Sequence, residues 1–311
     1  MDLSLILLKQ IMVIAIMIIF GFAAGKAKVL TLENSATISK LILYIIAPCM
    51  TLSALQLEYS SEKAIGFALA VVCAIVYHII MIAGTRWFAP ILKLKTVESA
   101  SIIYTNAGNL LIPIIGYVLG SEYVFYCCAY SVVQTVLFWT HLVSMMSGQK
   151  QMNVKKIILN PNIIACIVGL LLFFSRITFP EILGSALSRT GDCVGPMSMV
   201  VIGIMIADAD LKKIFSQKDI WIVTILRLII SPLLTAAVLG LLVNTIIPKS
   251  MISVLFVFFL ATAAPSASTV SQMANLEHKD EVLAGSINIM TVVLCILTMP
   301  LMTAVFQALV R

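Results

Sequence analysis

The residues of this sequence that could do chemistry are few, and most lie inside long apolar runs. The clearest group occupies residues 106–113, where the amides Asn106 and Asn109, together with Gly108 and Pro113, interrupt an apolar segment. Proline removes a backbone hydrogen bond, and glycine permits unusual backbone angles. Backbone groups freed in this way inside a membrane must face protein or water. The pattern predicts a broken helix with a binding site for a polar ligand beside it.

A second segment is interrupted in a similar way. Pro265 stands in a run of small and hydroxyl residues that includes Ser266, Ser268 and Thr269. If both helices break, their second halves begin inside the protein with unpaired N–H groups and partial positive charge, which suits an anionic ligand. A proline kink filled by Ser and Thr hydroxyls is the alternative for either segment alone. The matched positions of the two segments favour a binding site.

Polar residues recur at helical spacing in one further apolar run. Tyr130, Gln134 and His141 are separated by four and seven residues, so they share roughly one face of a helix. This face either lines the path of the ligand or makes hydrogen bonds to neighbouring helices. His78, alone in another apolar run, is interpreted as a core residue with a hydrogen-bond partner.

Ionisable residues within apolar runs are costly and by default mark function. Asp192 and Arg227 are of this kind, and with His141 they are the candidates for a proton or charge relay. Structural alternatives stay open. Arg189, three residues before Asp192, shares its helix face and could neutralise it. Arg227 could extend to the cytoplasmic surface or pair with Asp192.

The composition decides which class of protein must position these residues. The chain has 311 residues, of which 61% are hydrophobic and 11% are charged, against about 25% charged in soluble domains. A soluble enzyme and a disordered chain are both excluded. No GxSxG, HExxH, GxGxxG or phosphate-binding loop is present, so neither an enzyme nor an ATP-driven pump is expected. The seven cysteines have no metal-ligand spacing, so no metal or other cofactor is expected.

The apolar runs are long enough to cross a bilayer as helices. Ten spans are predicted, at residues 5–25, 35–56, 64–87, 97–119, 122–146, 157–175, 180–207, 219–246, 250–275 and 281–308. The short polar stretch 147–156, interpreted as a cytoplasmic linker, divides the chain into a first half at residues 1–146 and a second half at residues 157–311. Five spans per half is an odd number, so the halves insert in opposite directions, which is the inverted-repeat plan of many secondary transporters.

The basic residues indicate the orientation of the chain. One set of loops holds Lys26, Lys28, Arg86, Lys93, Lys95, Lys150, Lys155, Lys156, Lys212, Lys213, Lys218 and Lys279. The other set holds Lys63, Arg176, Lys249 and Arg311. Lysine and arginine favour the cytoplasmic side, so both termini are expected outside a cell membrane. The net charge of +6 is interpreted as this orientation signal and not as nucleic-acid binding.

The order of these motifs resembles the auxin efflux carrier family, which includes plant auxin exporters and bacterial malate and malonate permeases. Asn106, Gly108 and Pro113 match the spacing of the family motif Asn-x-Gly-x-x-Gly-x-Pro, whereas Leu111 replaces its second glycine. Pro48, the pair Asn160-Pro161, Pro265, the acidic loop Glu277–Glu281 and Pro300 also resemble the family. The resemblance covers essentially the whole chain.

The resemblance implies a scaffold of spans 1, 2, 6 and 7 and a moving part of spans 3–5 and 8–10, in which spans 4 and 9 cross at their prolines. It also implies a small organic anion bound beside that crossing, with Asn106 as the leading candidate for a contact to it. The partners expected are this anion and the lipid bilayer, with a homodimer left open. A sodium-coupled bile-acid-type symporter and a membrane receptor built on a transporter fold are the alternatives. The identity of the anion, the direction of transport and its coupling stay open.

Overall fold

The computed structural model describes residues 3–148, 155 and 158–310, and the secondary structure in these ranges is helical apart from one isolated β-bridge. The first half of the chain contains α1 (Leu3–Lys26), α2 (Leu32–Leu41), η1 (Ile42–Ile46), α3 (Ala47–Ala54), α4 (Ser61–Leu92), α5 (Thr96–Ile103), η2 (Ala107–Leu111), α6 (Ile112–Val118), α7 (Ser121–Leu137), η3 (Phe138–Leu142) and α8 (Val143–Ser147). The second half contains α10 (Pro161–Ser175), α11 (Glu181–Gly191), α12 (Val194–Asp208), α13 (Leu211–Ser216), α14 (Lys218–Ile225), η4 (Leu226–Ile230), α15 (Ser231–Thr245), η5 (Lys249–Met251), α16 (Ile252–Ala263), α17 (Ser268–Leu276) and α18 (Glu281–Leu309).

Many of these elements join end to end into long apolar helices. Within the described ranges, six continuous helices are long and apolar enough to cross a membrane, and they span Leu32–Ala54, Ser61–Leu92, Glu122–Ser147, Glu181–Asp208, Lys218–Thr245 and Glu281–Leu309. Shorter apolar helices cover Met12–Lys26, Pro161–Ser175 and Lys249–Ala263. The expected spans 97–119 and 250–275 are each divided into two shorter helices, α5 with η2–α6 and α16 with α17.

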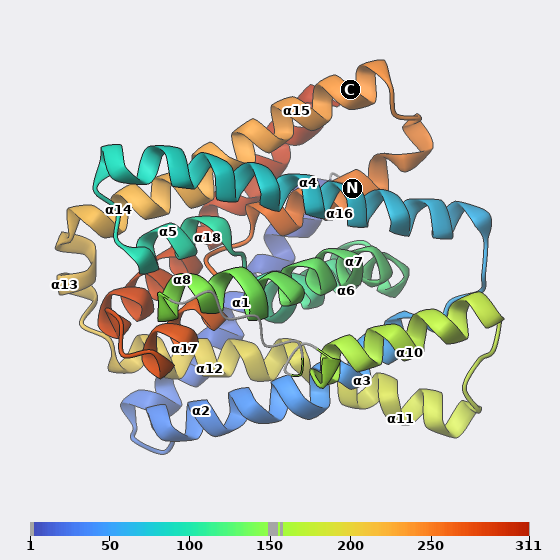
Figure 1. Cartoon of the computed structure of the whole chain (residues 1–311). Helices are drawn as coiled ribbons and strands as arrows, with labels where there is room; N and C mark the ends of the chain where they lie inside the picture. Colours follow the sequence, from blue (N-terminus) through green and yellow to red (C-terminus); the bar gives the residue numbers. More distant parts are fainter. Residues whose placement is uncertain (1–2, 149–154, 156–157, 311) are drawn as a thin grey trace.

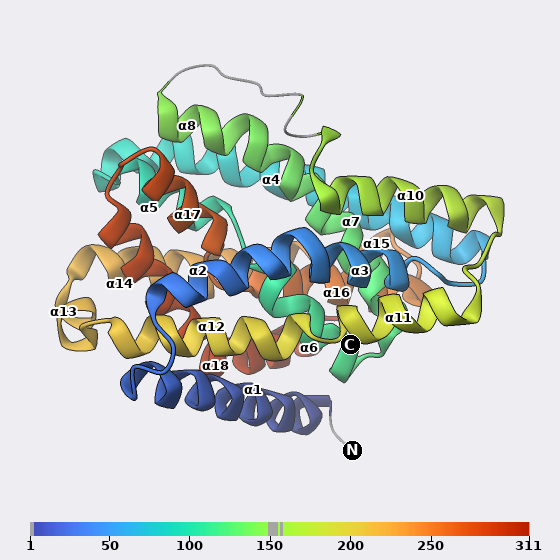
Figure 2. The same ribbon diagram turned by 90° about the horizontal axis from the view of Figure 1, so that it is seen from below.

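The helices form two packed groups (Figure 1). In one group, α1 packs against α12, α2 packs against α12, and α3 packs against α10 and α11. The contact between α1 and α12 is close, because a Cβ atom on Gly21 or Gly203 would overlap backbone atoms of the facing helix. Seen from below, α1 lies alongside α12 (Figure 2). We call these helices the first bundle.

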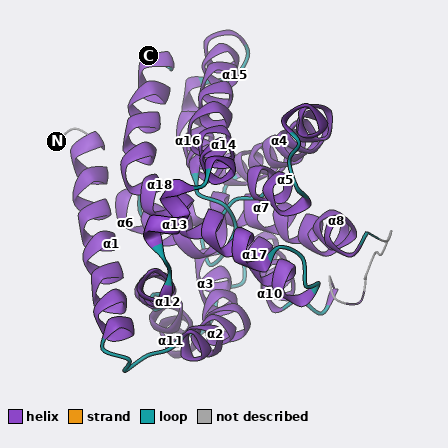
Figure 3. Cartoon of the chain, turned by 90° about the vertical axis from the view of Figure 1, so that its left-hand side faces the viewer, coloured by secondary structure: helices purple, strands orange, loops and turns teal. Residues whose placement is uncertain are grey.

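The second group contains α4, α5, α7, α14–η4–α15, α16, α17 and α18, which pack against one another. We call it the second bundle. Figure 3 shows α2, α11 and α12 together at the bottom, α14, α15 and α16 in the upper middle, and α4 to their right. The bundles meet where α12 and α1 contact η2, α6 and α18, and where α3 and α10 contact α7.

Polarity is distributed as in a membrane protein. Large apolar side chains are exposed on the outside of the bundles, for example those of Phe20, Trp87, Leu171 and Ile182. Soluble proteins rarely expose so much apolar surface, so this surface is suited to contact with lipid. Polar side chains including Asn106, Gln134, Arg227, Ser266 and Asn288 are buried inside.

Proline explains three π-helical turns in the described chain. The turns η1, η2 and η4 are each followed within two residues by a proline, namely Pro48, Pro113 and Pro232. Proline lacks the N–H that would bond the preceding turn and its ring crowds that turn. A π turn widens the helix locally, and such turns are frequent at functional sites. Asn106 is adjacent to η2, and Arg227 is in η4.

Candidate functional site

The two broken helices cross at their unwound segments. The N–H of Asn106 donates to the carbonyl of Pro265 at 2.8 Å, and the N–H of Ala267 donates to the carbonyl of Tyr104 at 3.0 Å. These bonds flank an antiparallel β-bridge between Thr105 and Ser266. The unwound backbones therefore satisfy part of each other's hydrogen bonding inside the protein. The crossing contains Pro265, whereas Pro113 begins the next helix eight residues after Thr105. The expectation that both helices open at their prolines is therefore wrong for Pro113.

Side chains from two neighbouring helices satisfy the remaining backbone groups of the crossing. Gln134 of α7 accepts from the Thr105 N–H at 2.9 Å and donates its Nε2 hydrogen to the Thr105 carbonyl at 2.8 Å. On the other unwound segment, Asn288 of α18 donates to the Ser266 carbonyl at 2.8 Å, and the Ser266 N–H donates to Thr291 Oγ1 at 3.2 Å. The buried amide of Gln134 thus supports the crossing instead of lining a path for the ligand.

Replacing Gln134 with leucine is expected to weaken the crossing. Leucine leaves the buried N–H and carbonyl of Thr105 without their side-chain partner, and each unpaired buried group costs about 1–3 kcal/mol. The purified Gln134→Leu protein should show a lower apparent melting temperature. Gln272→Leu, on an exposed position of α17, is the matched control and should melt near the wild type. Equal melting temperatures for the two variants would contradict this role of Gln134.

Arg227 is a fully buried cation at the crossing. Its side chain is 0% exposed, and its Nε donates to the Ala264 carbonyl at 3.0 Å. Its two terminal nitrogens reach the Ile102 carbonyl at 3.0 Å, the Tyr77 hydroxyl at 2.9 Å and the Thr262 carbonyl. Among the described residues its guanidinium makes no ion pair. The alternatives of an extended side chain at the surface and of a pair with Asp192 are both wrong.

The position of Arg227 sets the charge balance of the crossing. The carbonyls of Ile102 and Thr262 belong to the last turns of α5 and α16, where a helix presents partial negative charge. The guanidinium satisfies these carbonyls and offsets that charge. The second halves, η2–α6 and α17, begin at the crossing, and neither Asn106 nor Ala267 caps its helix with a side-chain hydrogen bond. The helix ends contribute only partial negative charge, so the crossing keeps the formal positive charge of Arg227. It also has two helix N-termini without a side-chain cap.

Two buried polar side chains beside the crossing have no hydrogen-bond partner among the described residues. The side chain of Asn106 is 6% exposed and makes no hydrogen bond within the described residues. The hydroxyl oxygen of Ser266 is buried without a partner. No described atom lies within 4 Å of where a Cβ of Gly108 would be, so there is open space next to this glycine. The three predicted residues Asn106, Gly108 and Ser266 are thus brought to the crossing.

The other predicted polar residues make hydrogen bonds to neighbouring helices of the second bundle. The hydroxyl of Tyr130 accepts from Thr105 Oγ1 at 3.2 Å. His141 Nδ1 is 2.8 Å from the Tyr104 hydroxyl. His78 Nδ1 donates to the Ala74 carbonyl at 2.7 Å, which confirms the interpretation of His78 as a core residue. For Tyr130 and His141 the observed contacts fit the alternative of interhelical hydrogen bonding.

Asp192 and Arg189 do not join this site. Both side chains are exposed, at the junction of α11 and α12 in the first bundle, and no ion pair between them is present among the described residues. The alternative in which Arg189 neutralises Asp192 is therefore wrong, and so is the expected burial of Asp192. Ser268 and Thr269 are half-buried at the start of α17. The side chains of Asn109 and Pro113 lie outside the described residues.

Sequence reasoning missed several residues of this site. Tyr77, Thr105, Asn288 and Thr291 each hold part of the crossing. The one signal in the sequence for these four residues is that each is a polar residue in an apolar run. Many residues of that kind have no role at a binding site, so the signal could not identify these four. No group of three or more His, Cys, Asp or Glu that could hold a metal ion occurs in the part of the chain that the structure describes.

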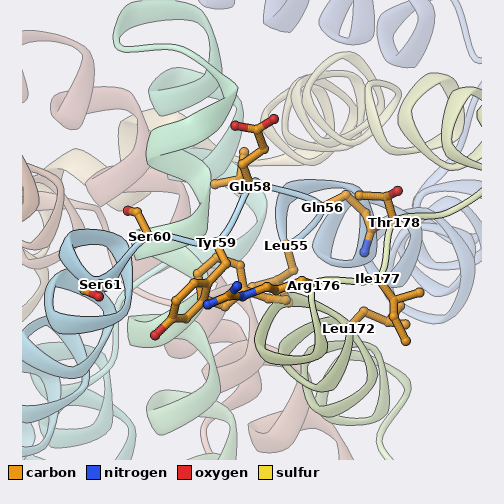
Figure 4. Close-up of a pocket in the computed structure, with 12 residues that line it drawn as sticks. Leu55, Gln56, Glu58, Tyr59, Ser60, Ser61, Leu172, Arg176, Ile177 and Thr178 are labelled. Carbon is orange, nitrogen blue, oxygen red and sulfur yellow. The ribbon is translucent and has the colours of Figure 1, made fainter.

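A cavity of about 580 Å³ lies away from the crossing, at the ends of α3 and α10 (Figure 4). The guanidinium of Arg176 lies over the Tyr59 ring, 4.9 Å from its centroid. Gln56 Oε1 accepts from the Phe179 N–H at 2.8 Å. These contacts connect the loop after α3 to the loop after α10, so the cavity lies where a linker joins the first bundle to α4. It shares no residue with the crossing.

Comparison with known proteins agrees with this architecture. A family model described as "Membrane transport protein" matches residues 6–303. No curated protein sequence matches the chain. Because the model covers nearly the whole chain, the protein belongs to this membrane transport family, the family of the auxin efflux carriers that its motifs resemble.

Proposed function

We propose that this protein is a secondary transporter that moves a small organic anion, such as malate, malonate or an auxin-like acid, across the cell membrane. The observation that carries the proposal is Arg227, a buried guanidinium at the helix crossing without an ion-pair partner in the described chain. A buried charge is costly unless it is paired. A bound carboxylate beside the crossing would supply the missing negative charge, with the uncapped N-termini as donors.

We further propose that the chain has ten spans in two inverted halves with both termini outside. The first bundle then serves as the scaffold and the second as the moving part, which exposes the crossing to each side in turn by a rocking or elevator-like movement. The bundles meet through α1 and α12 against η2, α6 and α18, and through α3 and α10 against α7. This interface is mainly apolar, which suits sliding because few hydrogen bonds have to break.

A sodium-coupled symporter is less well supported by these contacts. In many carriers, unwound carbonyls and helix C-terminal ends coordinate the sodium ion. Here the carbonyls of Ile102, Thr262 and Ala264 already accept hydrogen bonds from Arg227. The guanidinium thus occupies the position that a coupling cation would need. A receptor built on the same fold would bind the anion without flux.

Uptake of labelled malate by proteoliposomes tests the proposal. Uptake into vesicles that contain the protein, above that of protein-free vesicles and unchanged when choline replaces sodium, is the expected result. Uptake that needs sodium would favour the symporter. Binding of malate without uptake would favour the receptor. If malate fails, malonate and an indole carboxylic acid are assayed in the same way, and absence of both uptake and binding for all three would contradict the proposal.

A further inference from the structure

Glu98 is a buried carboxylate that no role described above explains. It is 2% exposed, and Glu98 and Arg227 are the two buried ionisable side chains, apart from His, Cys and Tyr, in the described chain. Glu98 lies in the first turn of α5, whose residues 97–103 are all buried. Helices α4, α14, α17 and α18 pack around α5. The C-terminal end of the same helix carries the crossing residues Tyr104, Thr105 and Asn106.

The two oxygens of this carboxyl group have different surroundings. Oε2 accepts the backbone N–H of Lys95 at 2.5 Å, which satisfies a donor at the start of the helix. Oε1 is buried and has no hydrogen-bond partner. One turn further along α5, the hydroxyl of Ser101 is also buried without a partner. Residues three apart lie on the same face of a helix, so two unsatisfied polar groups occur on one face of α5.

No nearby cation neutralises Glu98. The Nζ atom of Lys95 is instead 3.5 Å from Asp280 Oδ1, and among the described residues no ion pair includes Glu98. Most charged groups on the packed elements are exposed, namely Glu62 and Arg86 on α4, Lys218 and Asp219 on α14, and Asp280 and Glu281 at the start of α18. Lys63, in the first turn of α4, is half-buried. Helix α17 carries no ionisable residue, and neither does the described α8. Arg227 lies at the opposite end of α5.

An ionised oxygen that is buried with neither donor nor cation is costly, and such a group usually becomes neutral. We propose that Glu98 is a proton-binding site of the second bundle, and that the carrier moves a proton on Glu98 Oε1 together with its organic anion. The proton binds the lone pair of Oε1 on one side of the membrane and leaves it as a proton on the other. Asp219 and Asp280, both exposed near α5, would exchange this proton with the water on the side of Lys93 and Lys95.

The position of Glu98 suits such coupling. A full negative charge at the start of α5 interacts with the dipole of that helix, whereas a neutral group does not. Because the end of α5 is the crossing, the protonation state of Glu98 acts on the element that holds the ligand. A proton carried with a monovalent anion also makes the combined movement electrically neutral. This inference rests on the proposed transport function.

The Glu98→Gln variant tests the proposal in proteoliposomes loaded with a pH-sensitive dye. Glutamine keeps an oxygen for the Lys95 N–H but cannot release a proton. An imposed malate gradient should change the internal pH with the wild type, and this change should be lost with Glu98→Gln, whereas exchange of labelled for unlabelled malate continues. Glu122→Gln is the matched control, because Glu122 also lies in the first turn of a helix but is exposed. Proton movement with Glu98→Gln equal to the wild type would overturn the proposal.

Infrared spectroscopy gives a readout that does not need a transported substrate. The C=O stretch of a protonated carboxyl group is separate from the bands of carboxylates. The purified wild type should show such a band near neutral pH, and Glu98→Gln should lack it. An identical band in both proteins, or no band in the wild type, would overturn the assignment of Glu98. If malate, malonate and the indole carboxylic acid are neither transported nor bound but the band is present in the wild type and lost in the variant, the proton site stands and the proposed substrate class fails.

Discussion

Replacing Arg227 with methionine is expected to reduce transport by at least about 100-fold, which corresponds to about 2.7 kcal/mol. Methionine has a similar length but no charge and no donor. The carbonyls of Ile102, Thr262 and Ala264 would lose their hydrogen bonds, and the crossing would lose the positive charge that attracts the anion. Each unsatisfied carbonyl costs about 1–3 kcal/mol, but the removal of a buried charge offsets part of this cost. Transport is therefore expected to fall more than stability.

The measurement is initial uptake of the anion by proteoliposomes, together with the apparent melting temperature of each purified variant. Arg227→Lys keeps the charge but lacks the planar set of five donors, so it should retain part of the uptake. Arg189→Ala, at an exposed arginine in the first bundle, is the control and should transport like the wild type. Wild-type uptake by a folded Arg227→Met protein would contradict the role of this cation.

Replacing Asn106 with alanine is expected to reduce uptake strongly and leave the protein folded. The Asn106 side chain makes no hydrogen bond within the described residues, whereas its backbone N–H holds the crossing through Pro265. Alanine keeps that N–H and removes only the side-chain amide, which is the group free to contact the ligand. Loss of one polar contact to a bound ligand leaves buried groups unpaired and is expected to cost on the order of 10- to 100-fold in uptake or more.

The Asn106→Asp variant tests whether the ligand next to this residue carries a negative charge. Aspartate has nearly the volume of asparagine but adds a negative charge, so it should repel a carboxylate and reduce uptake at least as far as alanine does. Asn275→Ala, at an exposed position on α17, is the control. The assay is uptake of labelled malate, with gel-filtration profiles to verify folding. Uptake by Asn106→Asp above that of Asn106→Ala would argue against an anionic ligand at this position.

Local patterns in the sequence predicted much of the fold. Apolar runs predicted the long helices, because the length and hydrophobicity of a run are local properties of the sequence. Gly108 and Pro113 in one run and Pro265 in another predicted the two broken helices. The same patterns could not predict which residues meet. Gln134 had the helical spacing expected of a path-lining residue, but its hydrogen bonds to Thr105, 29 residues away, assign it to the crossing. Glu98 was not selected from the sequence at all, because its burial depends on the helices that pack around it.

Composition, the length of the apolar runs and the order of the motifs can be seen in the sequence, and they were enough to predict a helical membrane protein of a transporter family. The use of its charges became known from the packing of the helices. Arg227 contacts carbonyls 35, 37 and 125 residues away, and Asp192 is left exposed outside the site. The cost of a buried charge depends on the groups that surround it in space. Those groups come from several helices, so no local pattern can specify them.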